Sequence, residues 1–114
     1  MSATHERANR HLRASAAVFV ALGDSTRLSL VRNLAAGGPL SISRLTKGSR
    51  LTRQGITKHL RVLEHAGLVR SVRHGRERCF TLRPEPLGEA RRALDAIAAQ
   101  WDDALERLKA FVEE

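Results

Sequence analysis

The sequence predicts a mainly α-helical domain with one small β-hairpin, in the order α-α-α-α-β-β-α. Apolar residues recur at intervals of three and four through most of the chain, which is the spacing of one helix face. Residues 68–82 instead show the alternation of β-strands. The length of 114 residues fits one modest core, so we expect residues 1–114 to form a single domain.

The first two helices are expected over residues 5–22 and 25–36. Asp24 can cap the second, because its carboxylate accepts a backbone N–H of the first turn, and residues 37–39 (GGP) then stop that helix. The apolar positions of the first helix are Leu12, Ala16, Phe19, Val20 and Leu22. Those of the second are Leu28, Leu30, Val31 and Leu34.

Residues 41–66 are expected to form two short helices joined by a tight turn. Ser41 can cap the first of them, and residues 47–50 (KGSR) form the turn. Thr52 can cap the second, and Gly67 follows its end, where a left-handed residue is favoured. This arrangement is a helix-turn-helix, in which the second helix reads DNA.

The second of these helices has two different faces. Ile56, Leu60 and Leu63 lie on one side, while the other side carries Arg53, Gln54, Thr57, Lys58 and Arg61. Such side chains can pair with base edges and phosphates in a major groove. The alternative interpretation is an ordinary solvated helix face.

Residues 68–82 are expected to form a hairpin that turns at residues 74–75 (HG). Phe80 and Leu82 should share one face, and the tip carries Arg73, His74, Arg76 and Arg78. A cationic tip of this kind can act as a wing that reaches the phosphate backbone or the minor groove. The alternative is a charged edge that only prevents aggregation between strands.

The last helix is expected over residues 86–112, after a turn bracketed by Pro84 and Pro86. Its apolar stripe is wider than one neighbour needs, and a winged helix-turn-helix domain of this size is too small to bury it all. We therefore expect a homodimer through the N- and C-terminal helices, which suits a palindromic operator in double-stranded DNA. The expected interface residues are Leu12, Phe19, Leu94, Ile97, Trp101, Leu105 and Leu108.

Charge is unevenly distributed. Residues 1–83 contain 16 Lys/Arg and 4 Asp/Glu, a net charge of +12, whereas residues 84–114 contain 4 and 8, a net charge of −4. A basic body indicates a polyanionic partner. The single cysteine, Cys79, excludes a disulfide framework and fits a reducing cytoplasm. Because no apolar run approaches membrane-spanning length, we expect no membrane partner and no signal peptide.

Four segments in order resemble the ArsR/SmtB family of bacterial winged-helix repressors. They are residues 21–28 (ALGDSTRL), 40–45 (LSISRL), 56–63 (ITKHLRVL), and 66–69 (AGLV) followed by 73–76 (RHGR). The resemblance covers about residues 16–83, and Ser25 stands where the family usually has proline. It implies a homodimer that represses transcription and leaves its operator when an effector binds or a thiol changes state.

The metal sites typical of that family are missing from this sequence. Ser41 and Ser43 stand where a Cys-Val-Cys-like motif would supply thiolates, and the final helix contains no histidine. Weak surface sites of His5 with His11, or His59 with His65, are the alternative. We expect no metal and no other cofactor, as in the metal-independent, autorepressor-like subgroup that the chain resembles.

The sequence thus predicts a dimeric repressor of its own or a neighbouring operon. Base contacts are expected from Arg53, Gln54, Thr57 and Lys58, phosphate contacts from Thr52, His59 and Arg61, and wing contacts from the hairpin arginines. The alternatives are a repressor that senses a metal, small molecule or thiol state at the dimer interface, and a winged-helix protein–protein module. An enzyme is not expected, since no nucleophile–base pair or glycine-rich phosphate loop is present.

Overall fold

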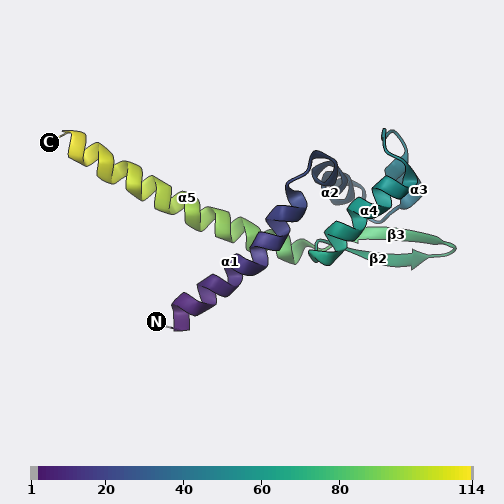
Figure 1. The fold of residues 1–114 in the computed structure, drawn as a ribbon, viewed down its shortest axis with the longest axis horizontal. Helices are drawn as coiled ribbons and strands as arrows, with labels where there is room; N and C mark the ends of the chain where they lie inside the picture. Colours follow the sequence, from purple (N-terminus) through teal and green to yellow (C-terminus); the bar gives the residue numbers. More distant parts are fainter. Residues whose placement is uncertain (1–2, 114) are drawn as a thin grey trace.

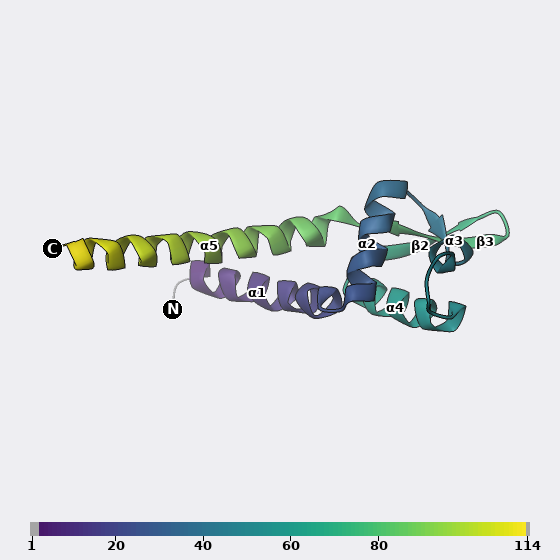
Figure 2. The same ribbon diagram turned by 90° about the horizontal axis from the view of Figure 1, so that it is seen from above.

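The computed structural model describes the backbone of residues 3–113 and the side chains of residues 10 and 12–113. A body of three helices and a small sheet lies at one end, and the long final helix extends away from it (Figure 1). In the second view, α1 runs beside α5, which continues beyond it (Figure 2). The elements are α1 (Ala3–Leu22), α2 (Ser25–Gly37), β1 (Leu40–Ser41), α3 (Ile42–Thr46), α4 (Arg53–His65), β2 (Val69–His74), β3 (Glu77–Leu82) and α5 (Pro84–Glu113).

The helix caps expected from the sequence are confirmed. Asp24, Ser41 and Thr52 precede α2, α3 and α4, and each side chain accepts the backbone N–H three residues later, at 3.0–3.1 Å. Gly67 follows α4 with a φ of 79°. Its N–H donates to Glu64 O and the N–H of Leu68 donates to Leu63 O, so α4 ends in a Schellman motif.

The sheet has three antiparallel strands in the order β1-β3-β2, one more than the hairpin that the sequence predicted. The extra strand pairs Leu40 with Phe80 and Ser41 with Cys79, which closes the second edge of β3. Cys79 is therefore a buried, free thiol on the central strand. The predicted fold class, a mainly α-helical winged helix-turn-helix, is confirmed.

The hairpin turn lies one residue later than expected. His74 pairs with Glu77, so the two connecting residues are Gly75 and Arg76, not His74 and Gly75. Gly75 has a φ of 67°, and a glycine with positive φ at the first of two loop positions is typical of a type II′ turn.

The core lies between α1, α2, α4 and the sheet. Ile56, Leu60 and Leu63 of α4 are almost completely buried in it, as expected. The fully buried side chains described in α1 are Ser15, Val18 and Ala21, with Phe19 and Leu22 partly buried beside them, while Leu12, Ala16 and Val20 are exposed. The exposed apolar side chains Leu12, Ala16 and Val20 are therefore not part of the core of their own chain.

Helix α5 begins at Pro84, two residues before the expected start. Both Pro84 and Pro86 fit in its first turn, because the first N–H groups of a helix have no intrahelical partner and a missing donor costs nothing there. Among its residues, only Ala90 is fully buried. Leu87 packs against the core, whereas the large apolar residues from Leu94 onwards are exposed in the single chain.

Candidate nucleic-acid interface

The polar side of α4 lies opposite its buried side. Arg53, Gln54, Lys58 and Arg61 are exposed, Thr57 is half-buried, and these five side chains line one shallow hollow of about 440 Å³. We call these five residues the reading surface. The amphipathic pattern predicted from the sequence is therefore present, and the polar groups converge on one patch.

Two hydrogen bonds shape the start of this surface. Nη1 of Arg53 donates to Oγ of Ser43 at 3.3 Å, which links α4 to α3. Oγ1 of Thr57 donates to the carbonyl of Arg53 at 2.8 Å, so its oxygen still has a free lone pair. Thr52 uses its oxygen as the cap acceptor, and its hydroxyl hydrogen remains able to donate to an anion.

The wing places cations at the end of the molecule opposite the free end of α5 (Figure 1). The tip side chains Arg73, His74, Arg76 and Arg78 are all exposed. Arg73 and Arg78 are directly paired across the hairpin. Like charges opposite each other in a sheet repel, so this pair is better suited to an anionic partner than to an isolated hairpin.

The structure brings further cations to this region that sequence reasoning missed. Arg44 and Lys47 line a polar hollow of about 580 Å³ together with Arg53 and with Glu77 of the wing. Both residues belong to the short α3 segment and its end. Their signal was present in the sequence, since cations on the first helix of a helix-turn-helix border the second one.

His59, for which a phosphate contact was expected, has a contact within the chain that the sequence did not suggest. Its half-buried ring lies beside the start of α2. Its Nδ1 atom lies 3.2 Å from Nη1 of Arg27 and 3.9 Å from Oδ2 of Asp24. We call Asp24, Arg27 and His59 the junction cluster. The pKa of Asp24 is lowered chiefly because its carboxylate accepts the backbone N–H of Arg27; burial is the main opposing effect, and the positive charge of Arg27 adds to the lowering.

The residues expected at a dimer interface are mostly exposed in the single chain. Leu12, Leu94, Ile97, Trp101, Leu105 and Leu108 are between 42% and 65% exposed. Phe19 differs, because it is partly buried and packs against the core of its own chain. An apolar hollow of about 420 Å³ lies between α1 and α5, bordered by Leu12, Ala93, Ala96 and Ile97 with three polar residues.

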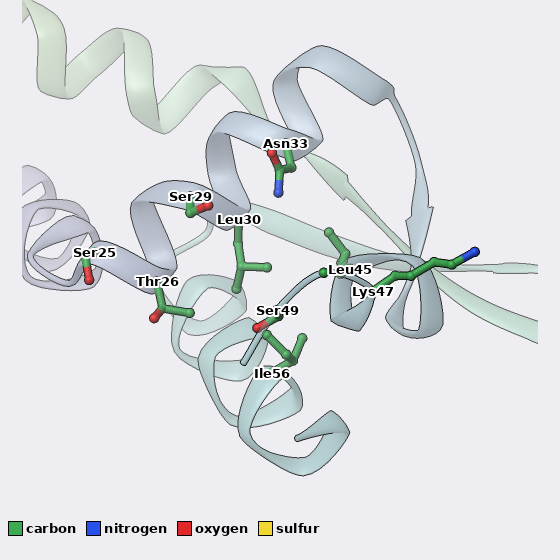
Figure 3. A pocket seen from close by; sticks show the side chains of 10 residues that line it. Ser25, Thr26, Ser29, Leu30, Asn33, Leu45, Lys47, Ser49 and Ile56 are labelled. Atoms are coloured by element: carbon green, nitrogen blue, oxygen red, sulfur yellow. The ribbon is translucent and has the colours of Figure 1, made fainter. Parts of the chain in front are cut away.

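A second polar hollow, of about 260 Å³, lies between α2, residues 45–49 and Ile56 of α4 (Figure 3). Ser29 and Asn33 of α2 border it on one side and Ser49 of the turn on the other, while the Lys47 side chain points away from it. It is open and contains no cluster of charged groups. The reading surface and the wing are therefore the candidate nucleic-acid interface.

Metal-binding groups do not gather in the described side chains, where no three His, Cys, Asp or Glu residues lie close enough to hold an ion. His5 and His11 lie outside these side chains. Within residues 3–113, no single helix has both the length and the hydropathy to cross a membrane. Only the pair Leu12–Leu22 and Ser25–Gly37, bent by 100°, meets those criteria when taken together.

Comparison with known proteins identifies this architecture. The family model of a helix-turn-helix domain matches residues 22–72. The HTH-type transcriptional regulator YuzN of Bacillus subtilis is 44% identical over 77 residues, which cover 62% of this chain and 84% of that protein. An ArsR-like transcriptional regulator from Rhodococcus sp. RHA1 has a similar structure, with a TM-score of 0.75 and 36% identity over 88% of this chain and 93% of its own.

The fold is also that of the homodimeric winged helix-turn-helix DNA-binding domain of Mb0332 from Mycobacterium bovis. The TM-score is 0.65, with 22% identity over 94% of this chain and 95% of that domain. The wing, the capped α4 and the sequence similarity all indicate the same family. The chain belongs to the ArsR family of helix-turn-helix transcriptional regulators, which bind DNA.

Proposed function

We propose that this protein is a homodimeric repressor that binds a palindromic operator through the reading surface and the wing, without a metal. The observation that carries the proposal is the convergence of Arg53, Gln54, Thr57, Lys58 and Arg61 on one face of a helix whose other face is buried. Such a helix can enter a major groove without uncovering any of the core.

Within this proposal, the contacts divide by their chemistry. Gln54 and Arg53 can pair with base edges in two-point contacts, which carry sequence information. Arg44, Lys47 and Arg61, with the wing arginines Arg73, Arg76 and Arg78, contact phosphates, which supply affinity but no sequence information. Arg27 occupies Nδ1 of His59, so Nε2 is the ring atom left for the phosphate contact expected of this residue.

The dimer part of the proposal rests on the exposed apolar stripe of α5. Its members follow one another at spacings of three and four residues, and α5 extends well beyond α1 (Figure 2). Exposed apolar patches of this extent normally mark an interface. The homodimeric Mb0332 domain supports the same arrangement.

The metal-independent part rests on donor chemistry. Soft metals prefer thiolates, and the positions where related sensors carry cysteines hold Ser41 and Ser43. Ser41 is also buried and already accepts the backbone N–H of Arg44 at 3.1 Å. The Ser41 oxygen is therefore already used as the N-cap of α3.

Selection of tight-binding duplexes from a randomised pool tests the proposal. We expect a palindrome whose half-sites lie about one helical turn, roughly 10 base pairs, apart, bound by two protomers in sedimentation. Selection of an asymmetric site by a single protomer would contradict the dimer. Failure to enrich any sequence would contradict the regulator, and would favour a winged helix that binds a partner protein.

A further inference from the structure

The junction cluster connects three helices through one guanidinium. Nε of Arg27 donates to the carbonyl of Ala21, and Nη2 donates to the carbonyl of Val20 at 3.4 Å. The backbone N–H of Arg27 donates to Asp24 at 3.0 Å, and Nη1 faces His59 at 3.2 Å. Arg27 thus joins the end of α1, the first turn of α2 and the middle of α4.

The hydrogen-bond chemistry assigns a protonation state to the contact. A guanidinium can only donate, so Nδ1 of His59 must accept, which requires a neutral ring with its proton on Nε2. The carboxylate of Asp24 can only accept and would need a proton on Nδ1. The distances of 3.2 Å to Arg27 and 3.9 Å to Asp24 favour the first arrangement.

The hydrogen bond between Arg27 and His59 gives α4 a directional contact on the side that faces α2. Ile56, Leu60 and Leu63 hold the helix on the core and set its approximate rotation, since turning the helix would expose them; a directional hydrogen bond can fix that rotation more finely. Among the described side chains, only two hydrogen bonds join α4 to other helices. They are Arg53 with Ser43, within the interface itself, and His59 with Arg27.

We propose that His59 is a positioning residue for DNA recognition. Its neutral ring, held by Arg27, fixes the rotation of α4 and so aims the reading surface at the base edges. This inference rests on the proposed function of α4 as the reader. It separates His59 from the phosphate contacts, because a positioning residue affects specific binding and leaves non-specific binding almost unchanged.

The test compares two variants on two probes, a duplex selected by the wild-type protein from a randomised pool and a random duplex of the same length. His59→Leu removes the acceptor and should weaken binding to the selected duplex about tenfold, the effect of one mismatched base pair. Its binding to the random duplex should stay within about twofold, because that binding depends on phosphate contacts. His59→Asn places Oδ1 near the position of Nδ1 and should restore binding to within about threefold of wild type.

A second pair of variants tests the partner of His59. Arg27→Met should reproduce the selectivity loss of His59→Leu, and the double variant should lose no more than either single variant. Asp24→Asn is the matched control, because asparagine keeps the N-cap and the His59–Arg27 contact, and its affinity should be unchanged. Circular dichroism shows whether Arg27→Met is folded, and the comparison of His59→Leu with His59→Asn remains decisive if it is not.

Three outcomes would overturn the inference alone, and a fourth would overturn the proposed function with it. Equal losses on both duplexes would mean that His59 contacts phosphate or only stabilises the fold. An unchanged His59→Leu variant would mean that apolar packing alone orients α4, and additive losses in the double variant would mean that His59 and Arg27 act separately. A wild-type protein that selects no duplex would overturn the proposed function as well, whereas the other outcomes leave it standing.

Discussion

Arg73 and Arg78 lie directly opposite each other across the wing, as paired residues of β2 and β3. Their like charges oppose hairpin formation and favour a phosphate between or beside them. Under the proposed function, the wing gives up some stability in the free protein and gains attraction for DNA. The same pairing makes the wing the simplest part of the interface to test.

Replacing Arg73 by alanine should weaken binding to all duplexes equally, because a phosphate contact carries no sequence information. The slope of log affinity against log salt should fall by about 0.9 for each wing. The unfolding midpoint should be unchanged or slightly higher, because the repulsion is gone. Arg91→Ala on α5 is the control for lost charge. A change in selectivity without a change in the salt slope would refute the phosphate assignment.

Gln54→Ala should lower the specificity of binding and leave the general affinity for DNA almost unchanged. The loss should be about 1–3 kcal/mol on the selected duplex, with little change on random DNA, since an amide side chain can make a two-point contact with adenine. Fluorescence anisotropy on both duplexes measures this difference. Glu64→Ala, at the far end of α4, is the matched control. If Gln54→Ala lowered both affinities by the same factor, Gln54 would not read a base.

Leu105→Asp should dissociate the dimer, because it places a charge in the exposed stripe of α5. Burial of one leucine contributes about 1.5–3 kcal/mol and the two-fold axis repeats the loss, so the dissociation constant should rise about a hundredfold or more. Sedimentation at micromolar concentration measures it, with Asp103→Asn as control. Trp101, 65% exposed in one chain, should shift its emission to the red on dissociation. Association of Leu105→Asp as strong as that of wild type would place the interface elsewhere.

The cap of α2 should make stability depend on pH. The pKa of Asp24 is lowered, chiefly because its carboxylate accepts the backbone N–H of Arg27. A carboxyl group of this kind stabilises the fold above its unfolded pKa of about 4, and the contribution disappears as the pH falls through the folded value. Wild type should therefore exceed Asp24→Asn in urea at pH 6, and this difference should shrink below about pH 4. Asp95→Asn is the control, and a constant difference would contradict the charge-based account.

Features encoded over a few residues could be predicted from the sequence. The caps Asp24, Ser41 and Thr52 and the left-handed Gly67 depend only on their neighbours along the chain, as does the apolar side of α4. These local signals fixed where α4 begins and ends. They also identified which side of it could meet DNA.

Features that depend on tertiary contacts could not be predicted. His59 lies on the helix face between the polar and the apolar side, and only the packing of α4 against α2 brings Arg27 to it. Strand β1 contains two residues, and its partner Phe80 lies far along the chain. Which apolar residues of α1 enter the core could not be told from the pattern, because apolar residues lie on more than one side of that helix.

The most direct test of the central claim is binding to the intergenic DNA upstream of the protein's own gene, measured at two salt concentrations with and without EDTA. We expect two protomers to bind this fragment at least about a thousandfold more tightly than random duplex, as specific regulators do, and the affinity to fall steeply with salt. EDTA and added Zn²⁺ should leave it unchanged. Binding no tighter than to random duplex would contradict repression of its own operon, and loss of binding in EDTA would contradict metal independence.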